Sequence, residues 1–85
     1  MTIPEAITSL NALYEGHAQH SYEAIGSEVA RIVAAFTVTD LKEVCRGFEL
    51  RSNLQSKATM QHAIEHKITR RKSIAERPDA SKQFA

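Results

Sequence analysis

The sequence predicts a small all-α protein that folds as one four-helix domain. Its apolar residues recur at intervals of three or four positions, the spacing of one helical face, in four separate stretches. These stretches lie near residues 3–15, 21–36, 38–48 and 56–70. A chain of 85 residues is just long enough to bury a single core, and its 42% hydrophobic content is that of an ordinary globular protein. We expect no strand, a single helical domain over residues 1–76, and a disordered tail over residues 77–85.

The first stretch begins with a helix-start signal. Thr2 stands three residues before Glu5, and a proline occupies the first turn between them. The apolar stripe of this helix consists of Ile3, Ile7, Leu10 and Tyr14. Gly16 can adopt the left-handed conformation that closes a helix, so we expect the helix to end there. Because so short a helix is marginal alone, its stripe must pack on another element.

The second stretch has the strongest periodicity in the chain. It follows residues 17–20, which form either a polar link or the opening turn of this helix. Its apolar positions are Ile25, Val29, Ile32, Val33 and Phe36. Gly26 lies inside the pattern and costs up to roughly 1 kcal/mol relative to alanine. Two interpretations stay open: Gly26 marks a face that another backbone approaches closely, or it is merely tolerated.

The third and fourth stretches form a pair over residues 37–69, joined by a tight and mostly polar connection. Thr37 stands three residues before Asp40 in a capping arrangement, and Ser56 is placed to cap the fourth helix. The two apolar faces comprise Val38, Leu41, Val44, Cys45 and Phe48, followed by Met60, Ala63, Ile64 and Ile68. The fourth pattern can continue as far as Glu76, because the residue before Pro78 avoids helical geometry.

The predicted core combines the strongest apolar positions of these stripes. It consists of Ile25, Val29, Ile32, Phe36, Leu41, Phe48, Leu50, Met60 and Ile64. Leu50 and Leu54 are spaced too regularly for solvent-exposed loop residues, so we expect them to pin the connection onto the two helices that it joins.

Residues 37–69 resemble a known DNA-binding module. The run T-V-x-D-L-K-x-V-C, then F-E-L, then S-K-A-x-M-x-x-x-I is similar to the SAP motif, a helix–extended loop–helix unit. It is also similar to the N-terminal helical subdomain of the bacterial transcription terminator Rho, where an Asn-Leu pair, here Asn53-Leu54, lies in the connection. Glu49 stands where the SAP pattern has a glycine before Leu50, and the connection lacks the usual glycine. The resemblance implies a C-terminal SAP-like helix–loop–helix that binds DNA.

The charge of the chain is polarised along its length. Residues 1–43 hold two basic and six acidic side chains, a formal charge of −4, whereas residues 44–85 hold nine and four, a charge of +5. A basic half of this kind attracts a polyanion by neutralising its charge and releasing counterions. The candidate nucleic-acid-binding residues are Arg51, Asn53, Gln55, Ser56, Lys57, Lys67, Arg70, Arg71 and Lys72. The alternative is that residues 70–72 neutralise the carbonyl end of a helix and stay solvated.

The residue types of the basic stretch favour one mode of nucleic-acid binding. Lysine and arginine neutralise phosphates, so we expect them to hold a backbone more than to read bases. No aromatic residue lies in this stretch, which makes duplex binding a better expectation than stacking of single-stranded bases. DNA is therefore the expected partner in preference to RNA.

Metal, cofactor and catalytic sites find little support in the sequence. His17 and His20, and then His62 and His66, have helix-compatible spacings, but the second pair does not form an H-E-x-x-H motif and the only cysteine is expected to be buried. We expect surface histidines, with no metal and no cofactor. The single cysteine falls on an apolar face, where it acts as a small hydrophobic residue. The chain has no Gly-rich phosphate loop and no nucleophile–base pair, so we do not expect an enzyme.

These observations lead to one favoured function and one alternative. The favoured function is a small cytoplasmic nucleic-acid-binding protein of a prokaryote or its virus, which docks on duplex DNA. Cytoplasmic placement is expected because the sequence shows no secretory signal, no membrane-spanning run and no cysteine pair. The alternative is an adaptor or inhibitor that binds another protein, or a second copy of itself, through the apolar stripe of residues 3–14 or through its charge polarity.

Overall fold

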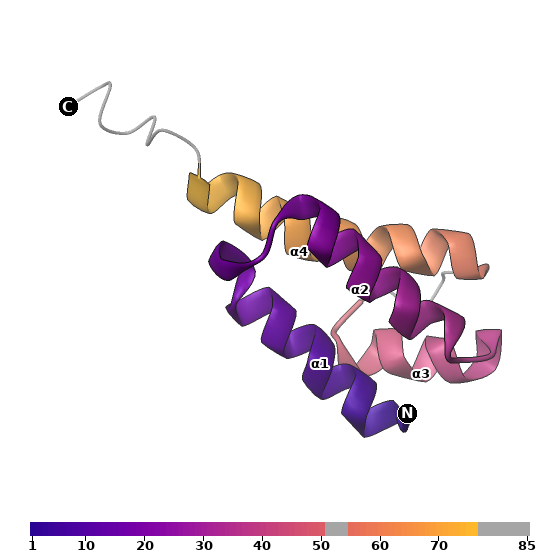
Figure 1. The fold of residues 1–85 in the computed structure, drawn as a ribbon. Helices are drawn as coiled ribbons and strands as arrows, with labels where there is room; N and C mark the ends of the chain where they lie inside the picture. The colour runs from indigo at the N-terminus through magenta and orange to yellow at the C-terminus, as the bar shows by residue number, and fades with distance from the viewer. Residues whose placement is uncertain (51–54, 77–85) are drawn as a thin grey trace.

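The structure is a computed structural model that describes residues 1–50 and 55–76. Within these ranges the chain forms four α-helices, a single 3-10 turn and no strand, which confirms the all-α prediction (Figure 1). Helices α1, α2, α3 and α4 span Ile3–Glu15, Tyr22–Ala34, Val38–Gly47 and Lys57–Glu76, and the 3-10 turn η1 spans His17–Gln19. The predicted tail, residues 77–85, and the connection residues 51–54 lie outside the described part of the chain.

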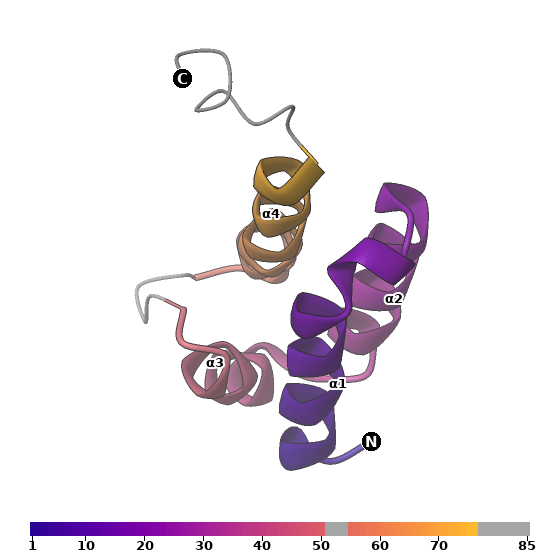
Figure 2. The same cartoon turned by 90° about the vertical axis from the view of Figure 1, so that its left-hand side faces the viewer.

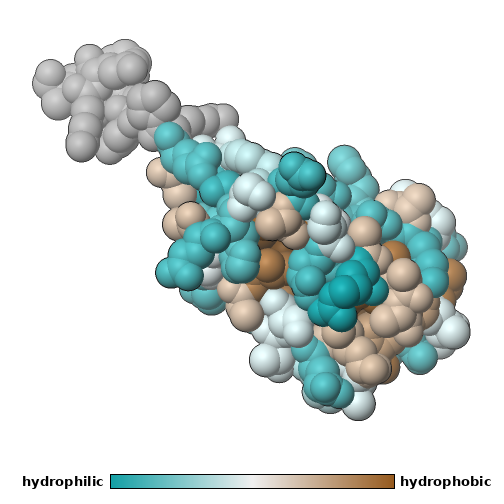
Figure 3. Space-filling view, in the orientation of Figure 1, coloured by the Kyte–Doolittle hydropathy of each residue, from teal (hydrophilic) through white to brown (hydrophobic). Residues whose placement is uncertain are grey.

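Helix α4 is the element on which the others converge. It packs against α1, α2, α3 and η1, while α1 also packs against α3. In Figure 2, α4 is seen nearly end-on, with α3 below it on the left, α1 below it and α2 beside it on the right. Polar residues cover most of the face shown in Figure 3, and apolar residues gather toward the end where α2 passes into α3. No helix in residues 1–50 or 55–76 has both the length and the apolar character that a membrane crossing requires.

The core contains almost every residue that the sequence predicts for it. Eight of the nine are buried, and Leu50 is partly buried against them. Helix α1 is turned differently from the expected stripe: Ala6, Leu10 and Leu13 are buried, whereas Ile3 and Ile7 are only partly buried. The reason is that α1 faces α3 on one side and α2 and α4 on another, so its innermost line runs between the residues of the simple stripe.

Side-chain caps fix the starts of the helices. Thr2 and Glu5 form a reciprocal capping box, with the Thr2 amide 3.0 Å from the Glu5 carboxylate and the Glu5 amide 3.2 Å from the Thr2 hydroxyl. Ser21 and Thr37 accept amide hydrogen bonds in the same way at α2 and α3. The prediction for Gly16 is wrong in one respect. Its φ of −95° is not left-handed, because the chain continues directly from α1 into η1 instead of reversing.

Two glycines lie where helices approach each other closely. A Cβ atom on Gly26 would lie 3.0 Å from Oε1 of Glu65, so the close neighbour of Gly26 is a side chain of α4 and not a backbone. Gly47 was not singled out from the sequence, yet a Cβ atom there would overlap the Ile7 side chain, whose Cγ1 would lie only 2.9 Å away. Gly47 therefore lets α1 approach α3.

Helix α3 ends in a turn that strains one residue. The Glu49 amide donates to the Arg46 carbonyl at 3.0 Å, and the Leu50 amide donates to the Cys45 carbonyl at 2.9 Å. This pair of bonds is the Schellman arrangement, which requires a left-handed residue after the cap. Glu49 has a φ of 60°, the conformation that glycine adopts most easily. It is also the position where the SAP pattern has glycine.

Replacing Glu49 with glycine should stabilise the protein. The substitution removes the Cβ strain of the left-handed conformation, and part of that gain is offset by the greater freedom of glycine in the unfolded chain. We expect the free energy of unfolding to rise by about 0.5–1 kcal/mol, measured by urea denaturation. Glu49→Ala is the matched control, because alanine retains the strain. An equal rise in the free energy of unfolding for both substitutions would mean that the Glu49 carboxylate, and not its backbone conformation, destabilises the wild-type protein.

Candidate nucleic-acid interface

Helix α4 has two different sides. One side is turned toward the other helices, and every fourth residue on it is buried: Met60, Ile64, Ile68 and Lys72. The other side carries polar residues that remain exposed or half-exposed. The start of α4 is fixed by Ser56, whose hydroxyl accepts from the Thr59 amide at 3.2 Å, as the sequence predicts.

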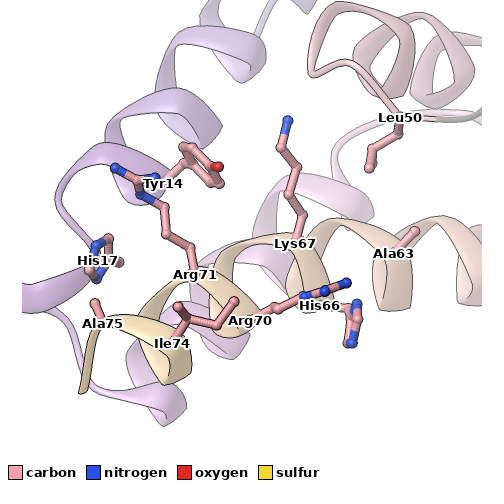
Figure 4. Close-up of a pocket in the computed structure, with 10 residues that line it drawn as sticks. All are labelled: Tyr14, His17, Leu50, Ala63, His66, Lys67, Arg70, Arg71, Ile74 and Ala75. Atoms are coloured by element: carbon pink, nitrogen blue, oxygen red, sulfur yellow. The ribbon is translucent and has the colours of Figure 1, made fainter. Parts of the chain in front are cut away.

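An open groove runs beside α4, bounded by the end of α1, by η1 and by the end of α3 (Figure 4). Its volume is about 660 Å³. The residues that line it are Tyr14, His17, Leu50, Ala63, His66, Lys67, Arg70, Arg71, Ile74 and Ala75. Three of these are lysine or arginine, two are histidine and none is acidic. The groove, called the basic groove below, therefore concentrates positive charge where an anion could dock.

Lys67 is held inside the basic groove by the end of α3. Its Nζ donates to the Phe48 carbonyl at 2.5 Å, and it lies 4.0 Å from the centroid of the Phe48 ring. The Phe48 carbonyl is one of the groups that a helix end leaves unpaired, so a cation is favourable there. The sequence predicts Lys67 as a phosphate contact, but the structure gives its ammonium a partner within the protein.

Arg71 lies beside Tyr14, which α1 contributes to the basic groove. The Arg71 guanidinium carbon is 4.6 Å from the centroid of the Tyr14 ring, within the range of a cation–π interaction. Tyr14 in turn meets the Phe48 ring edge-on, with centroids 6.1 Å apart. Figure 4 shows Lys67 and Arg71 directed toward α1 and α3, whereas Arg70 and His66 leave α4 in another direction. The aromatic residue that the basic stretch lacks in sequence thus comes from another helix, though Arg71 and Lys67 already cover its ring.

Lys72 does not line the basic groove, although it belongs to the same basic run. Its residue is only 6% exposed, its ammonium pairs with Glu76, and it lies 5.3 Å from the centroid of the Tyr22 ring. The hydrogen bond from Lys72 holds the pKa of the Glu76 carboxyl below its usual value. The four-residue spacing from Met60 through Ile68 to position 72 is the signal that could have placed Lys72 inside.

The other predicted residues lie away from the basic groove. Gln55, Ser56 and Lys57 stand at the start of α4, and Lys57 is half-buried. Thirteen residues separate Lys57 from Arg70, or roughly 20 Å along the helix axis. A single phosphate cannot reach both, but a nucleic-acid backbone can. Arg51 and Asn53 lie outside the described residues.

The remaining polar groups near the site show no metal centre. The His62 and His66 rings stack with centroids 5.9 Å apart, but no group of three or more potential ligands occurs among the described residues. His17 is 9% exposed, and its Nδ1 has no hydrogen-bond partner in the described part of the chain. Cys45 is buried, and this burial raises the pKa of its thiol.

Comparison with known proteins adds no further assignment. No protein-family model, curated protein or solved structure matches this chain. The resemblance of residues 37–69 to SAP modules therefore rests on the residues themselves, and the basic groove has to be interpreted from its own chemistry.

Proposed function

We propose that this protein binds nucleic acid, DNA in preference to RNA, by docking the basic groove and the adjoining length of α4 on the phosphate backbone. One observation carries the proposal: lysine, arginine and histidine side chains line the basic groove, and none of its ten lining residues is acidic. Phosphate binding by such a surface releases counterions, which provides affinity without reading sequence. Docking of this kind requires no cofactor and no catalysis.

The basic residues contribute to this proposal in different ways. Arg70 and Arg71 are exposed, so their guanidinium groups can reach phosphates in solution. Lys67 is already bound to the Phe48 carbonyl and adds positive potential more than a direct contact. Lys57 lies at the start of α4, where free backbone amides favour a second phosphate. We include the SAP-like character of α3, the connection and α4 in the proposal on the strength of the sequence resemblance.

A protein partner remains the second candidate, and one feature of the basic groove favours it. The lining includes Leu50, Ala63, Ile74 and Ala75, and Ile74 is 54% exposed. An acidic segment with apolar side chains would match this mixture. The apolar stripe of α1 is less available to a partner, because Leu10 is buried and Ile3, Ile7 and Tyr14 pack against the core. A stable dimer or a stoichiometric acidic protein partner would favour this alternative.

The proposal is tested by the salt dependence of binding. Each phosphate contact contributes about −0.9 to the slope of log affinity against log salt on duplex DNA. Lys57→Ala and Arg71→Ala should each weaken binding to every sequence and make the slope shallower by roughly one unit. Gel-shift titrations at several salt concentrations measure both quantities.

The control is Lys42→Ala. Lys42 is exposed on α3, away from the basic groove, and Asp40 and Glu43 lie beside it in the sequence, so its removal should change the slope much less. If the wild-type protein binds neither DNA nor RNA at about 50 mM salt, where backbone binding is strong, the proposal fails. The basic groove would then be assigned to an acidic protein partner.

A further inference from the structure

The outward side of α4 has no helix packed on it. In Figure 2 the other three helices lie below α4 or beside it on the right, and none of them lies above it. The exposed and half-exposed residues of this side, called the outer face, are Thr59, His62, His66, Thr69, Arg70 and Ser73. Every one of these six side chains can donate or accept a hydrogen bond, and the large apolar side chain of Ile74, which is 54% exposed, lies beside them. A surface of this kind fits a polar partner with which it can form many hydrogen bonds.

The two carboxylates of α4, those of Glu65 and Glu76, lie at the edge of the outer face on the side of α2. Glu65 is turned toward α2, where the missing side chain of Gly26 leaves room for its carboxylate. Glu76 is paired with the buried Lys72 and accepts from the Tyr22 hydroxyl at 3.4 Å. Glu65 also lines a hollow on the side of α2, where its carboxylate would repel a phosphate backbone. The side of α4 toward the basic groove, which has no acidic lining residue, suits a polyanionic partner better.

The outer face is a ridge with a hollow on each side. The basic groove lies on the side of α1, and a second hollow of about 560 Å³ lies on the side of α2. His66, Arg70 and Ile74 line both hollows, so they form the crest between them. Lys67 and Arg71 line the first hollow. The second hollow is lined by Tyr22, Glu65, Thr69 and Ser73, so it contains one acidic side chain. In shape, a ridge flanked by two hollows matches a groove flanked by two phosphate backbones.

We infer that α4 enters the major groove of duplex DNA and that His66, Thr69 and Arg70 hydrogen-bond to base edges there. The inference rests on the proposed function and adds that the protein reads sequence as well as neutralising phosphates. The basic groove, whose lining has no acidic residue, receives one of the two backbones that border the major groove. Arg70 can pair with O6 and N7 of guanine through its forked guanidinium, and the hydroxyl and imidazole groups suit several other base edges.

The dimensions of α4 agree with this placement. A helix with its side chains is about 10–12 Å across, and the major groove of B-form DNA is about 12 Å wide. The outer face extends from Thr59 to Ser73, or roughly 21 Å along the axis, comparable to the length of about six base pairs. The major groove of duplex RNA is deep and narrow and excludes a helix. Insertion of α4 therefore predicts that the protein distinguishes duplex DNA from duplex RNA, which docking on the backbone alone does not predict.

The test is selection of preferred sites from a random duplex DNA library with the full-length protein, followed by affinity measurements on the enriched site. We expect an enriched site that binds at least ~10-fold more tightly than a shuffled duplex of the same composition, because the loss of a single base contact can reduce affinity by that factor. Duplex RNA of the same sequence should bind at least ~10-fold more weakly. Arg70→Lys retains the charge but not the fork, so it should lose most of the preference at one base pair and leave the salt slope unchanged.

The control variant is Lys57→Ala, which should weaken binding to the selected and shuffled duplexes equally. If no site is enriched and duplex RNA binds as tightly as duplex DNA, the inference is overturned and the proposed backbone binding stands. If Arg70→Lys keeps the full preference, Arg70 does not read a base, and the inference is overturned for that residue. If no nucleic acid of any kind binds, both the inference and the proposed function are overturned.

Discussion

Replacing Phe48 with alanine should unfold a large part of the protein at 25 °C. Phe48 is fully buried where α3 ends, its ring meets Tyr14 edge-on, and Lys67 covers it. Removing such a side chain costs about 3–5 kcal/mol through lost burial and the cavity left behind. A domain of this size has about 5 kcal/mol of stability in total. Circular dichroism during thermal and urea unfolding measures the loss.

The matched control for Phe48→Ala is Val38→Ala at the other end of α3. Val38 is 39% exposed, so its truncation leaves no enclosed cavity and should cost less than about 1 kcal/mol. An unchanged melting temperature for Phe48→Ala would show that the Phe48 ring is not in the core. The orientation of α3 against α1 and α4 would then be wrong.

Local signals explain why the helices could be predicted from the sequence. The capping residues Thr2, Ser21, Thr37 and Ser56 act within three positions of themselves, so their effect is visible in any short window of sequence. Apolar spacing is equally local, and it identified eight buried core residues correctly. Helix α4 extends beyond the expected residues 56–70 as far as Glu76, the last residue that the structure describes there, and so includes the extension that the pattern before Pro78 allows.

The candidate site depends on contacts that are not local. Tyr14 lies more than 50 positions before Arg71, and only the packing of α1 beside α4 brings the two together. The same packing converts a linear basic run into three different roles. Arg70 is exposed, Arg71 lies on an aromatic ring, and Lys72 is buried against Glu76. Neighbours in sequence point about 100° apart on a helix, so charge counting along the chain cannot separate them.

Gly47 and the turn after α3 also depend on features that the sequence alone does not reveal. Gly47 could not be recognised as a contact point, because Ile7, which fills the space beside it, is 40 positions away. Glu49 could be noticed only as a departure from the SAP pattern. The hydrogen bonds that force its left-handed conformation depend on where α3 ends, and helix ends are the least certain part of any prediction from sequence.

Lys67 offers the sharpest separation between a structural role and a binding role. Replacing it with methionine retains most of the aliphatic length and removes the ammonium that donates to the Phe48 carbonyl. A hydrogen bond from a charged donor contributes about 1.5–3 kcal/mol, and its loss leaves the carbonyl at the end of α3 without that partner. We expect Lys67→Met to lower the free energy of unfolding by about 2 kcal/mol, measured by urea denaturation.

Arg71→Met is the matched comparison, because Arg71 lines the same groove but is exposed, and its contact with Tyr14 is a surface cation–π interaction. Such an interaction contributes only about 0.5–1 kcal/mol. Under the proposed function, Arg71→Met should therefore weaken DNA binding with little loss of stability. Lys67→Met removes the same charge, but it should reduce stability and weaken DNA binding less than Arg71→Met does. Equal stability for the wild type and Lys67→Met would show that the ammonium does not hold the Phe48 carbonyl. Lys67 would then join Arg70 and Arg71 as a residue available to a ligand, and the positive charge of the basic groove would be more accessible than the structure indicates.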